Sequence, residues 1–471
     1  MAMKKIILLS LVFVYTAQIL SAQKYNQIRL QNKPRNYIVY LPKNFNASEN
    51  LPLVINMHGF LTTSQFQMDY SQFNKFADSV RSIVIYPEGV DLRWNSGTFF
   101  FVSSDVDDVG FLSDLMDRAA VLYNADMKKV FATGYSAGGF MCYKLACDLT
   151  NRVAAIAPNV ASMVFDNLNS CVPARPVNMA AFNGLSDPVT TYNGIPLNFP
   201  SIDSVKHFWQ IKNNCNVLPM VDTLPDIRND GTRVVRYTYQ NCDDNAEQVF
   251  YKVINGGHVW PGANDIFFGV LGKTTQDISM NSVAWNFFKT KEVPANVRCD
   301  APSNLQATVI TNDSFVVSWS PVVGVAKYKI AIADDSDRVT FYETSNTSLG
   351  IKINNSTRLY RWNVASLCAS GYHNWNSTKN LNNIITSVKT NSIQTITIYP
   401  NPAKDYILLD LPKNRSSNLS VSIFNLLGEE VLKTNTIPEN NSIDISQLPV
   451  GMYHLLFSSN NNNFISSFIK D

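Results

Sequence analysis

The chain has 471 residues, of which 45% are hydrophobic and 16% charged, and its formal net charge at pH 7 is +2. Its length predicts two or three domains rather than one. The composition excludes a largely disordered chain, and the near-neutral charge gives no indication of nucleic acid or an acidic membrane surface as a partner.

Residues 1–22 have the layout of a signal peptide. Lys4 and Lys5 precede an apolar run from Ile6 to Leu20, and a small residue, Ala22, ends the segment at the expected cleavage point. A membrane anchor is the alternative, but the run is shorter than the ~20 residues that span a bilayer. We therefore predict export, and no integral membrane segment in the remainder of the chain.

Short apolar runs rich in β-branched residues alternate with amphipathic stretches from Tyr37 to about Lys291, within a first domain predicted over residues 23–292. Helices are predicted over 65–80 and 109–123, with another beginning at Ser136. Alternation of this kind favours an α/β fold with a parallel sheet buried on both faces. The predicted strands are Tyr37–Leu41, Leu53–Met57, Ile83–Tyr86, Val130–Thr133, Pro176–Phe182 and Val249–Ile254.

Two small all-β sandwich domains are predicted after residue 294, where helical periodicity ends. Residues 299–390 resemble a fibronectin type III module through the runs at 315–320 and 360–364. Residues 396–471 contain blocks around Pro400, Phe424 and Gly451 that resemble the C-terminal sorting domain of type IX secretion. That resemblance implies contact with the secretion machinery, and a small β binding module is the alternative.

The segment Gly134-Tyr135-Ser136-Ala137-Gly138 matches the pattern G-x-S-x-G. A strand leads into it and a helical pattern follows, which is the context that a nucleophile elbow needs. Its glycines permit a strained turn that exposes the serine hydroxyl. We predict Ser136 as the nucleophile; a glycine-rich turn that only caps the helix is the alternative.

A nucleophilic serine needs a base, and three histidines lie in the predicted catalytic region. His207 falls in a helical pattern. His58 follows an early strand, and in folds with a nucleophile elbow this position carries an oxyanion loop rather than a base. His258 lies on a late glycine-flanked loop, which agrees with the chain order serine, acid, histidine. We predict His258 as the base; a structural loop histidine is the alternative.

Asp187 follows a predicted buried strand and is the predicted acid, which would orient the imidazole of His258. Asp203 and Asp222 follow buried strands less clearly, and an Asx turn before Pro188 is the alternative role for Asp187. The backbone N–H groups of Phe60 and Ala137 are predicted to form the oxyanion hole.

Seven cysteines in an exported chain predict disulfides. Cys142 is left over and is expected to be a buried hydrophobe. The hypothesised pairs are Cys147 with Cys171, Cys215 with Cys242, and Cys299 with Cys368.

Five sequence blocks, in order, resemble the extracellular polyhydroxybutyrate depolymerase, feruloyl esterase and acetyl xylan esterase family: 58–59, 107–111, 134–139, 186–188 and 256–262. In that family Asp107 and Asp108 belong to the start of a helix, and we expect both to be structural. Asn183 stands where the family commonly has histidine, and this difference is expected to alter the floor of the pocket.

The resemblance implies a secreted serine esterase without metal or organic cofactor. Its expected substrate is a polymeric ester, and feruloyl or acetyl groups on plant cell-wall polysaccharide are preferred. A polyhydroxybutyrate depolymerase is the first alternative, and a carbohydrate-binding or adhesion protein with an inactive esterase domain is the second. We expect a monomer that is free outside the cell or attached to its surface. His58 and Trp260 are candidate substrate contacts, because aromatic faces bind planar acyl groups and sugars; core packing is the alternative for Trp260, Trp94 and Phe99–Phe101.

Overall fold

The computed structural model describes residues 23–471 except 31–32, 98–105, 312–313, 354–358, 377–378, 381–396, 411–418, 426–428, 437, 439 and 460–461. The expected signal peptide and the aromatic run Phe99–Phe101 lie outside the described residues. The chain folds as two compact units. The first extends to Arg298 and includes 370–373, and the second comprises 299–369 and 374–471.

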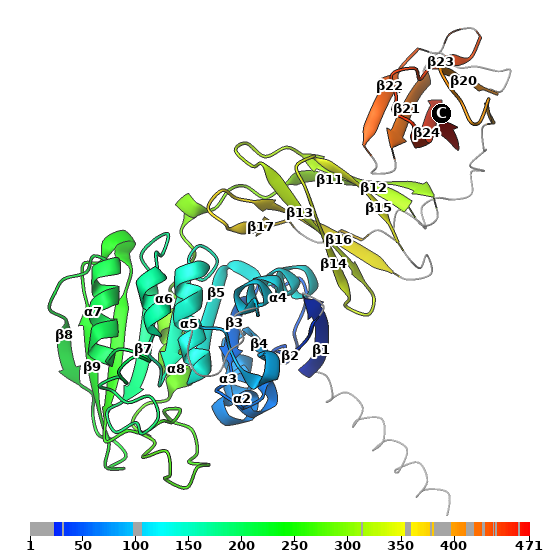
Figure 1. The fold of residues 1–471 in the computed structure, drawn as a ribbon. Helices are drawn as coiled ribbons and strands as arrows, with labels where there is room; N and C mark the ends of the chain where they lie inside the picture. The colour runs from blue at the N-terminus through cyan, green and yellow to red at the C-terminus, as the bar shows by residue number, and fades with distance from the viewer. Residues whose placement is uncertain are drawn as a thin grey trace, which may run out of the picture. The chain divides into compact units, whose positions relative to one another are not determined.

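The first unit is built on one mixed sheet with the strand order β1-β2-β4-β3-β5-β6-β7-β10-β9-β8 (Figure 1). Neighbouring strands from β4 to β10 pair in parallel, while β1, β2, β8 and β9 add antiparallel edges. The strand bounds are β1 (Gln23–Leu30), β2 (Lys33–Tyr40), β3 (Pro52–Met57), β4 (Ile83–Pro87), β5 (Asp126–Tyr135), β6 (Ala155–Asn159), β7 (Asn178–Gly184), β8 (Met220–Thr223), β9 (Arg233–Tyr239) and β10 (Gln248–Ile254).

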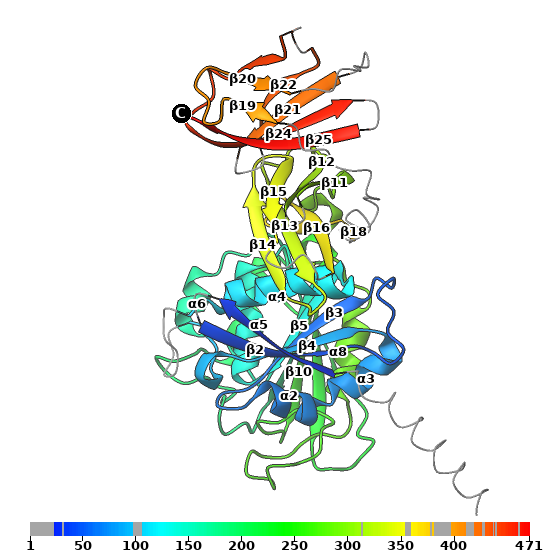
Figure 2. The ribbon, with the colours of Figure 1, turned by 90° about the vertical axis from the view of Figure 1, so that its right-hand side faces the viewer.

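Helices cover both faces of this sheet, so the central strands are buried on both sides (Figure 2). Helix α3 packs against α8, and α4 packs against α5. The bounds are α2 (Ser64–Ser71), α3 (Phe73–Val80), α4 (Asp108–Tyr123), α5 (Ala137–Asp148), α6 (Phe165–Ser170), α7 (Ile202–Lys212) and α8 (Met280–Phe288), with short 3₁₀ turns at Val90–Leu92, Asp243–Asn245 and Ala295–Val297. No helix in the described ranges is long and apolar enough to cross a membrane.

The prediction of one continuous helix over residues 65–80 is wrong. The stretch 65–80 forms two helices, α2 and α3, which meet at Gln72. Gln72 has a φ of 51°, in the left-handed region, and its backbone N–H donates to the carbonyl oxygen of Met68. This backbone conformation ends α2 and lets the chain change direction before α3 begins.

The three hypothesised disulfides are confirmed. Cys147 bonds to Cys171 and Cys215 to Cys242 in the first unit, and Cys299 bonds to Cys368 in the second. Cys142 is free and fully buried, and burial raises the pKa of its thiol well above the usual value. It therefore behaves as a small apolar side chain, as expected.

The second unit consists of small antiparallel sheets around two separate hydrophobic cores. The first core lies between the sheets β11-β12-β15 and β14-β13-β16-β17 and contains Trp319, Tyr328 and Trp362, while β18 pairs with β16. The bounds are β11 (Ser303–Thr311), β12 (Ser314–Ser320), β13 (Lys327–Asp334), β14 (Val339–Thr344), β15 (Ser348–Lys352), β16 (Tyr360–Leu367), β17 (His373–Trp375) and β18 (Lys379–Asn380). The likeness to fibronectin type III stays a prediction.

The second core, which includes Ile407, Ile423 and Phe468, lies between the sheets β19-β20-β23 and β22-β21-β24-β25. The division of this region into domains at 299–390 and 396–471 stays a prediction. The bounds are β19 (Ile398–Tyr399), β20 (Tyr406–Leu409), β21 (Leu419–Asn425), β22 (Glu430–Thr434), β23 (Ser442–Asp444), β24 (Gly451–Ser459) and β25 (Asn462–Lys470).

Candidate active site

The candidate residues follow the carboxyl ends of parallel strands, at one edge of the sheet. His58 follows β3, Ser136 follows β5, Asp187 lies just beyond β7, and His258 lies just beyond β10. In open α/β sheets this edge is where ligands bind. The topology thus gathers residues that are far apart in the sequence.

Ser136 occupies a sharp turn between β5 and α5. Its φ of 53° and ψ of −117° are strained for a residue with a side chain. Its N–H donates to the carbonyl oxygen of Asn159 at 3.0 Å, and its own carbonyl accepts from Gly139 and Phe140 at 2.7 and 3.0 Å. Its hydroxyl makes no capping hydrogen bond to the helix, unlike the serine of an ordinary N-cap.

Glycine is required on either side of this turn because backbone segments approach very closely. A Cβ atom at position 138 would lie 2.2 Å from the carbonyl oxygen of Met57, and one at position 134 would lie 2.5 Å from the backbone of residue 138. Neither contact can be relieved by moving a side chain. The glycines of the motif therefore let the start of α5 pack against the end of β3.

Asp187 and His258 are in direct contact. The Nδ1 atom of His258 lies 2.7 Å from Oδ2 of Asp187, and only 3% and 4% of the two residues is exposed, respectively. Oδ1 of Asp187 accepts the backbone N–H groups of Val189 and Thr190, both at 2.8 Å. Asp187 thus forms the turn expected from its sequence and also meets the imidazole, one oxygen serving each purpose.

The two other acids considered from the sequence are engaged elsewhere. Asp203 pairs with Lys206 on α7, and Asp222 pairs with Arg236 between β8 and β9. His207 lies exposed on α7. None of these three residues meets His258.

Buried polar groups fix the His258 loop. The hydroxyl of Tyr135 donates to the carbonyl oxygen of His258 at 2.8 Å, and Nδ2 of Asn159 donates to the carbonyl oxygen of Val259 at 3.0 Å. The His258 N–H donates to the carbonyl of Leu271 at 2.6 Å. The sequence did not predict that Tyr135 and Asn159 support this loop. No local pattern marks that role, because their partners lie in the loop after β10, at least 100 positions away.

A cavity of about 210 Å³ opens beside Ser136. Its wall is largely apolar, and it includes both residues expected to supply the oxyanion hole, Phe60 and Ala137. Ala137 is the first residue of α5, so its N–H has no acceptor within the helix. The lining residues are Phe60, Arg93, Trp94, Ser96, Gly97, Ser136, Ala137, Phe140, Val164, Val189, Thr190, Ile195 and Phe199.

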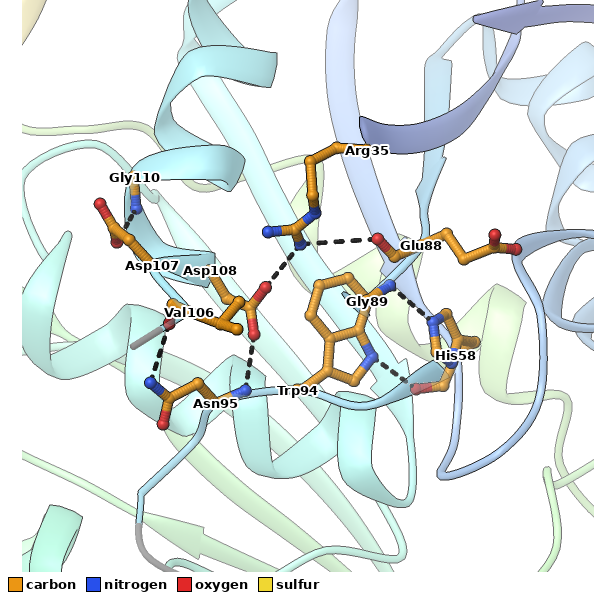
Figure 3. Close-up of polar contacts among 10 residues, drawn as sticks. All are labelled: Arg35, His58, Glu88, Gly89, Trp94, Asn95, Val106, Asp107, Asp108 and Gly110. Carbon is orange, nitrogen blue, oxygen red and sulfur yellow. Dashed lines mark hydrogen bonds and ion pairs between the residues drawn. The ribbon is translucent and has the colours of Figure 1, made fainter. Parts of the chain in front are cut away.

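His58 is fully buried and does not line this cavity, contrary to its expected role as a substrate contact. Nε2 accepts the N–H of Gly89 at 2.9 Å (Figure 3). Nδ1 donates to the carbonyl oxygen of Gly59 at 2.7 Å. Burial lowers the pKa of His58 to about 4, so the ring is neutral at pH 7. The side chain holds the loop that leads to Phe60.

Further contacts extend this support (Figure 3). The indole N–H of Trp94 donates to the carbonyl oxygen of His58 at 2.9 Å, and the Trp94 ring lies in the cavity wall. Asp108 forms a buried ion pair with Arg35 at 2.5 Å and accepts the N–H of Asn95 at 2.6 Å. It is structural as expected, although through this ion pair rather than as a cap.

Asp107 is the helix cap that the sequence predicts: its Oδ1 accepts the N–H of Gly110 at 2.7 Å, at the start of α4. The pKa of Asp108 is raised by burial, and the positive charge of Arg35 opposes that shift. The carboxylate is thereby kept as the partner of Arg35.

Two sequence expectations about the pocket do not match the cavity beside Ser136. Trp260 is 1% exposed, its indole N–H donates to Oδ1 of Asn281 at 3.1 Å, and it does not line the cavity. Asn183 is buried, donates to the carbonyl oxygen of Ala161 at 3.0 Å and is not among the residues that line this cavity.

The sheet order, with a serine at the turn after β5 and an Asp–His contact beyond β7 and β10, defines an α/β-hydrolase-like domain followed by small antiparallel β-sheets. Residues 397–471 match the family described as the secretion system C-terminal sorting domain. A sorting domain of this kind indicates secretion of the chain and contact with a secretion machinery.

The chain is distantly related to esterases of the feruloyl and acetylxylan type. It is 27% identical over 238 residues to feruloyl esterase B of Piromyces equi, covering 48% of this chain and 42% of that protein. It is 26% identical over 239 residues to a bifunctional acetylxylan esterase/xylanase of Neocallimastix patriciarum, covering 50% and 33%. The chain thus spans less than half the length of these relatives.

Among solved structures, the acetyl xylan esterase from Aspergillus awamori is similar at 17% identity with a TM-score of 0.38. The similarity covers 50% of this chain and 94% of that one.

Proposed function

We propose that this protein is a secreted serine esterase with Ser136, His258 and Asp187 as its catalytic triad. The observation that carries the proposal is the buried 2.7 Å contact between His258 and Asp187 at the sheet edge where Ser136 borders a cavity. The distant relationship to esterases supports the same reaction class.

In the proposed reaction, Oγ of Ser136 attacks the ester carbonyl carbon while Nε2 of His258 takes the hydroxyl proton. Asp187 accepts a hydrogen bond from Nδ1 and stabilises the imidazolium. The backbone N–H groups of Phe60 and Ala137 hold the oxyanion. His258 then gives its proton to the leaving alcohol. In the second half of the reaction His258 takes a proton from water as the water oxygen attacks the acyl carbonyl carbon, and Oγ of Ser136 leaves with that proton, which releases the acid.

The test is hydrolysis of p-nitrophenyl acetate by the purified protein. Ser136→Ala should lower kcat by about a thousandfold or more, and the double variant with His258→Ala should be no worse than either single variant. A Ser136→Ala variant that keeps a tenth of the activity would refute the nucleophile. An inactive wild-type protein would favour a binding protein with an inactive esterase domain.

The substrate we propose is a feruloyl or acetyl ester on plant cell-wall polysaccharide. The names of the relatives support this choice, and so does the aromatic cavity wall formed by Phe60, Trp94, Phe140 and Phe199. Side-by-side values of kcat/KM for methyl ferulate, acetylated xylan and 3-hydroxybutyrate oligomers decide the matter. A preference for the oligomers would overturn the plant-wall proposal and leave the triad intact.

A further inference from the structure

Arg93 is the one ionisable side chain among the described residues that line the cavity beside Ser136. The other lining residues are apolar or neutral, and no carboxylate is among them. A guanidinium group stays protonated at every pH at which the protein folds. The wall of the cavity that Ser136 borders therefore carries a fixed positive charge.

That charge has no carboxylate partner among the described residues. The guanidinium carbon of Arg93 lies 5.6 Å from the centre of the Phe60 ring, and its Nε atom is buried without a hydrogen-bond acceptor in the described part of the chain. Leaving a buried donor unsatisfied costs about 1–3 kcal/mol, and more when the donor is charged. The terminal nitrogens of the guanidinium are not among the buried atoms without a partner, so they are the donors that an acceptor from outside the protein would meet in the cavity.

Two of the carboxylates that lie near Arg93 in the sequence, Glu88 and Asp108, already have hydrogen-bond donors. Glu88 accepts from Nδ2 of Asn36 and from the backbone N–H and hydroxyl of Ser64. Asp108 accepts from Arg35 and from the Asn95 N–H. Neither carboxylate forms an ion pair with Arg93 in the described part of the chain.

We propose that Arg93 binds a carboxylate on the ester substrate, so that the enzyme selects esters whose acyl or alcohol part is anionic. This inference rests on the proposed esterase function. Guanidinium pairs well with carboxylate because its planar fork can donate two parallel hydrogen bonds. The apolar wall strengthens the pairing, because water competes less there than at the surface.

The position of Arg93 relative to Phe60 places the recognised group near the reacting centre. Phe60 carries one of the proposed oxyanion donors, and its ring lies beneath the guanidinium. A carboxylate held by Arg93 would orient the ester carbonyl toward Ser136 and the two N–H groups. Arg93 would then raise kcat/KM by positioning the substrate.

The experiment compares matched pairs of esters in which a free carboxylate is replaced by its methyl ester, and the dependence on Arg93 separates the effect of the charge from that of the methyl group. The first pair is mono-p-nitrophenyl succinate and its methyl ester, which place the carboxylate on the acyl side. The second pair is 4-acetoxybenzoate and its methyl ester, which place it on the alcohol side. We expect the wild-type protein to prefer the anionic member of one pair by about tenfold or more in kcat/KM, the gain of one charge-assisted contact.

Arg93→Met should abolish that ratio whatever its absolute rates, and Arg93→Lys should restore part of it. Arg228→Met is the matched control, because Arg228 is exposed and does not line the cavity. It removes the same charge and should keep the wild-type ratio. The pair that shows the preference identifies the side of the ester that carries the carboxylate.

Two outcomes would overturn the inference: a wild-type protein without charge preference in either pair, or an Arg93→Met variant that keeps the preference. Calorimetry separates this failure from failure of the esterase proposal. Monomethyl succinate and benzoate are titrated into the Ser136→Ala variant with and without Arg93→Met. If wild-type protein hydrolyses nothing, Arg93-dependent binding still supports the site, and its absence refutes it.

Discussion

The hydroxyl of Tyr135 donates a hydrogen bond of 2.8 Å to the carbonyl oxygen of His258, a residue 123 positions further along the chain. Tyr135 immediately precedes Ser136, so the strand that carries the proposed nucleophile is bonded directly to the loop that carries the proposed base. The ring of Tyr135 also lies 5.1 Å from the imidazole of His258. One side chain thus sets the spacing of both proposed catalytic groups.

Tyr135→Phe should lower kcat by about tenfold or more, because small displacements of a base are costly, while KM changes little. It should also destabilise the protein by about 1–3 kcal/mol, since the His258 carbonyl loses its partner. Tyr143→Phe is the control: its hydroxyl is also buried but has no hydrogen-bond partner in the described structure. Equal losses of kcat in both variants would contradict a positioning role for Tyr135.

The roles of the two Asp187 oxygens, one in the turn and one in the contact with His258, can be tested separately by substitution. Asparagine keeps an acceptor for the N–H groups of Val189 and Thr190 but offers an amide to the imidazole, which then favours the wrong tautomer. Asp187→Asn should therefore lose about a thousandfold or more in kcat with little loss of stability. Asp187→Ala should lose the same activity and also about 1–3 kcal/mol of stability.

Stopped assays with p-nitrophenyl acetate and urea unfolding of both variants provide the comparison. An Asp187→Asn variant with near wild-type kcat would show that the contact with His258 does not serve catalysis. Equal stability of the two variants would show that the hydrogen bonds of the turn contribute nothing measurable to the free energy of unfolding.

His58 makes stability depend on pH. Burial lowers its pKa from the usual value of 6.5 to about 4, so between these values the unfolded chain takes up a proton that the folded chain does not. The stabilising effect of the neutral ring is complete above pH 6.5 and is lost as the pH falls, by about 1.4 kcal/mol per pH unit down to about pH 4.

His58→Gln removes this titration while keeping an acceptor for the N–H of Gly89. We expect the variant to be less stable at pH 7 by about 1–3 kcal/mol, because donation to the Gly59 carbonyl is lost. The difference from wild type should shrink as the pH falls from 7 to 4 in urea unfolding of the first unit. His207→Gln, at an exposed site, is the matched control. A constant difference for His58→Gln would contradict the prediction.

Deletion of residues 397–471 should leave the esterase rate of the purified protein unchanged and stop its release from the native host. The reason is that the hydrophobic core of this segment is formed entirely by residues from 398 onward, so the first unit loses no core contact. Activity is measured with p-nitrophenyl acetate, and export by immunoblot of the culture medium. Loss of activity in a folded, truncated protein would show that the tail supports the catalytic unit.

The buried strands and the turn at Ser136 could be predicted from the sequence, because both depend on local residue patterns. The buried strands β3, β4, β5, β7 and β10 are short apolar runs, and the elbow is marked by glycines whose close contacts no other residue permits. The break at Gln72 was missed because glutamine carries no turn signal, and the conformation there is set by packing. The Arg35–Asp108 pair was missed because its members are 73 positions apart and meet only once the sheet forms.

The disulfide between Cys299 and Cys368 has a mechanical consequence. It joins the first residue of the second unit to a residue just after β16. Tension applied between the catalytic unit and the C-terminal segment passes through this bond and bypasses the intervening strands β11 to β16. While the disulfide is intact, a pulling force between the two ends of the chain would therefore not unfold β11 to β16 strand by strand.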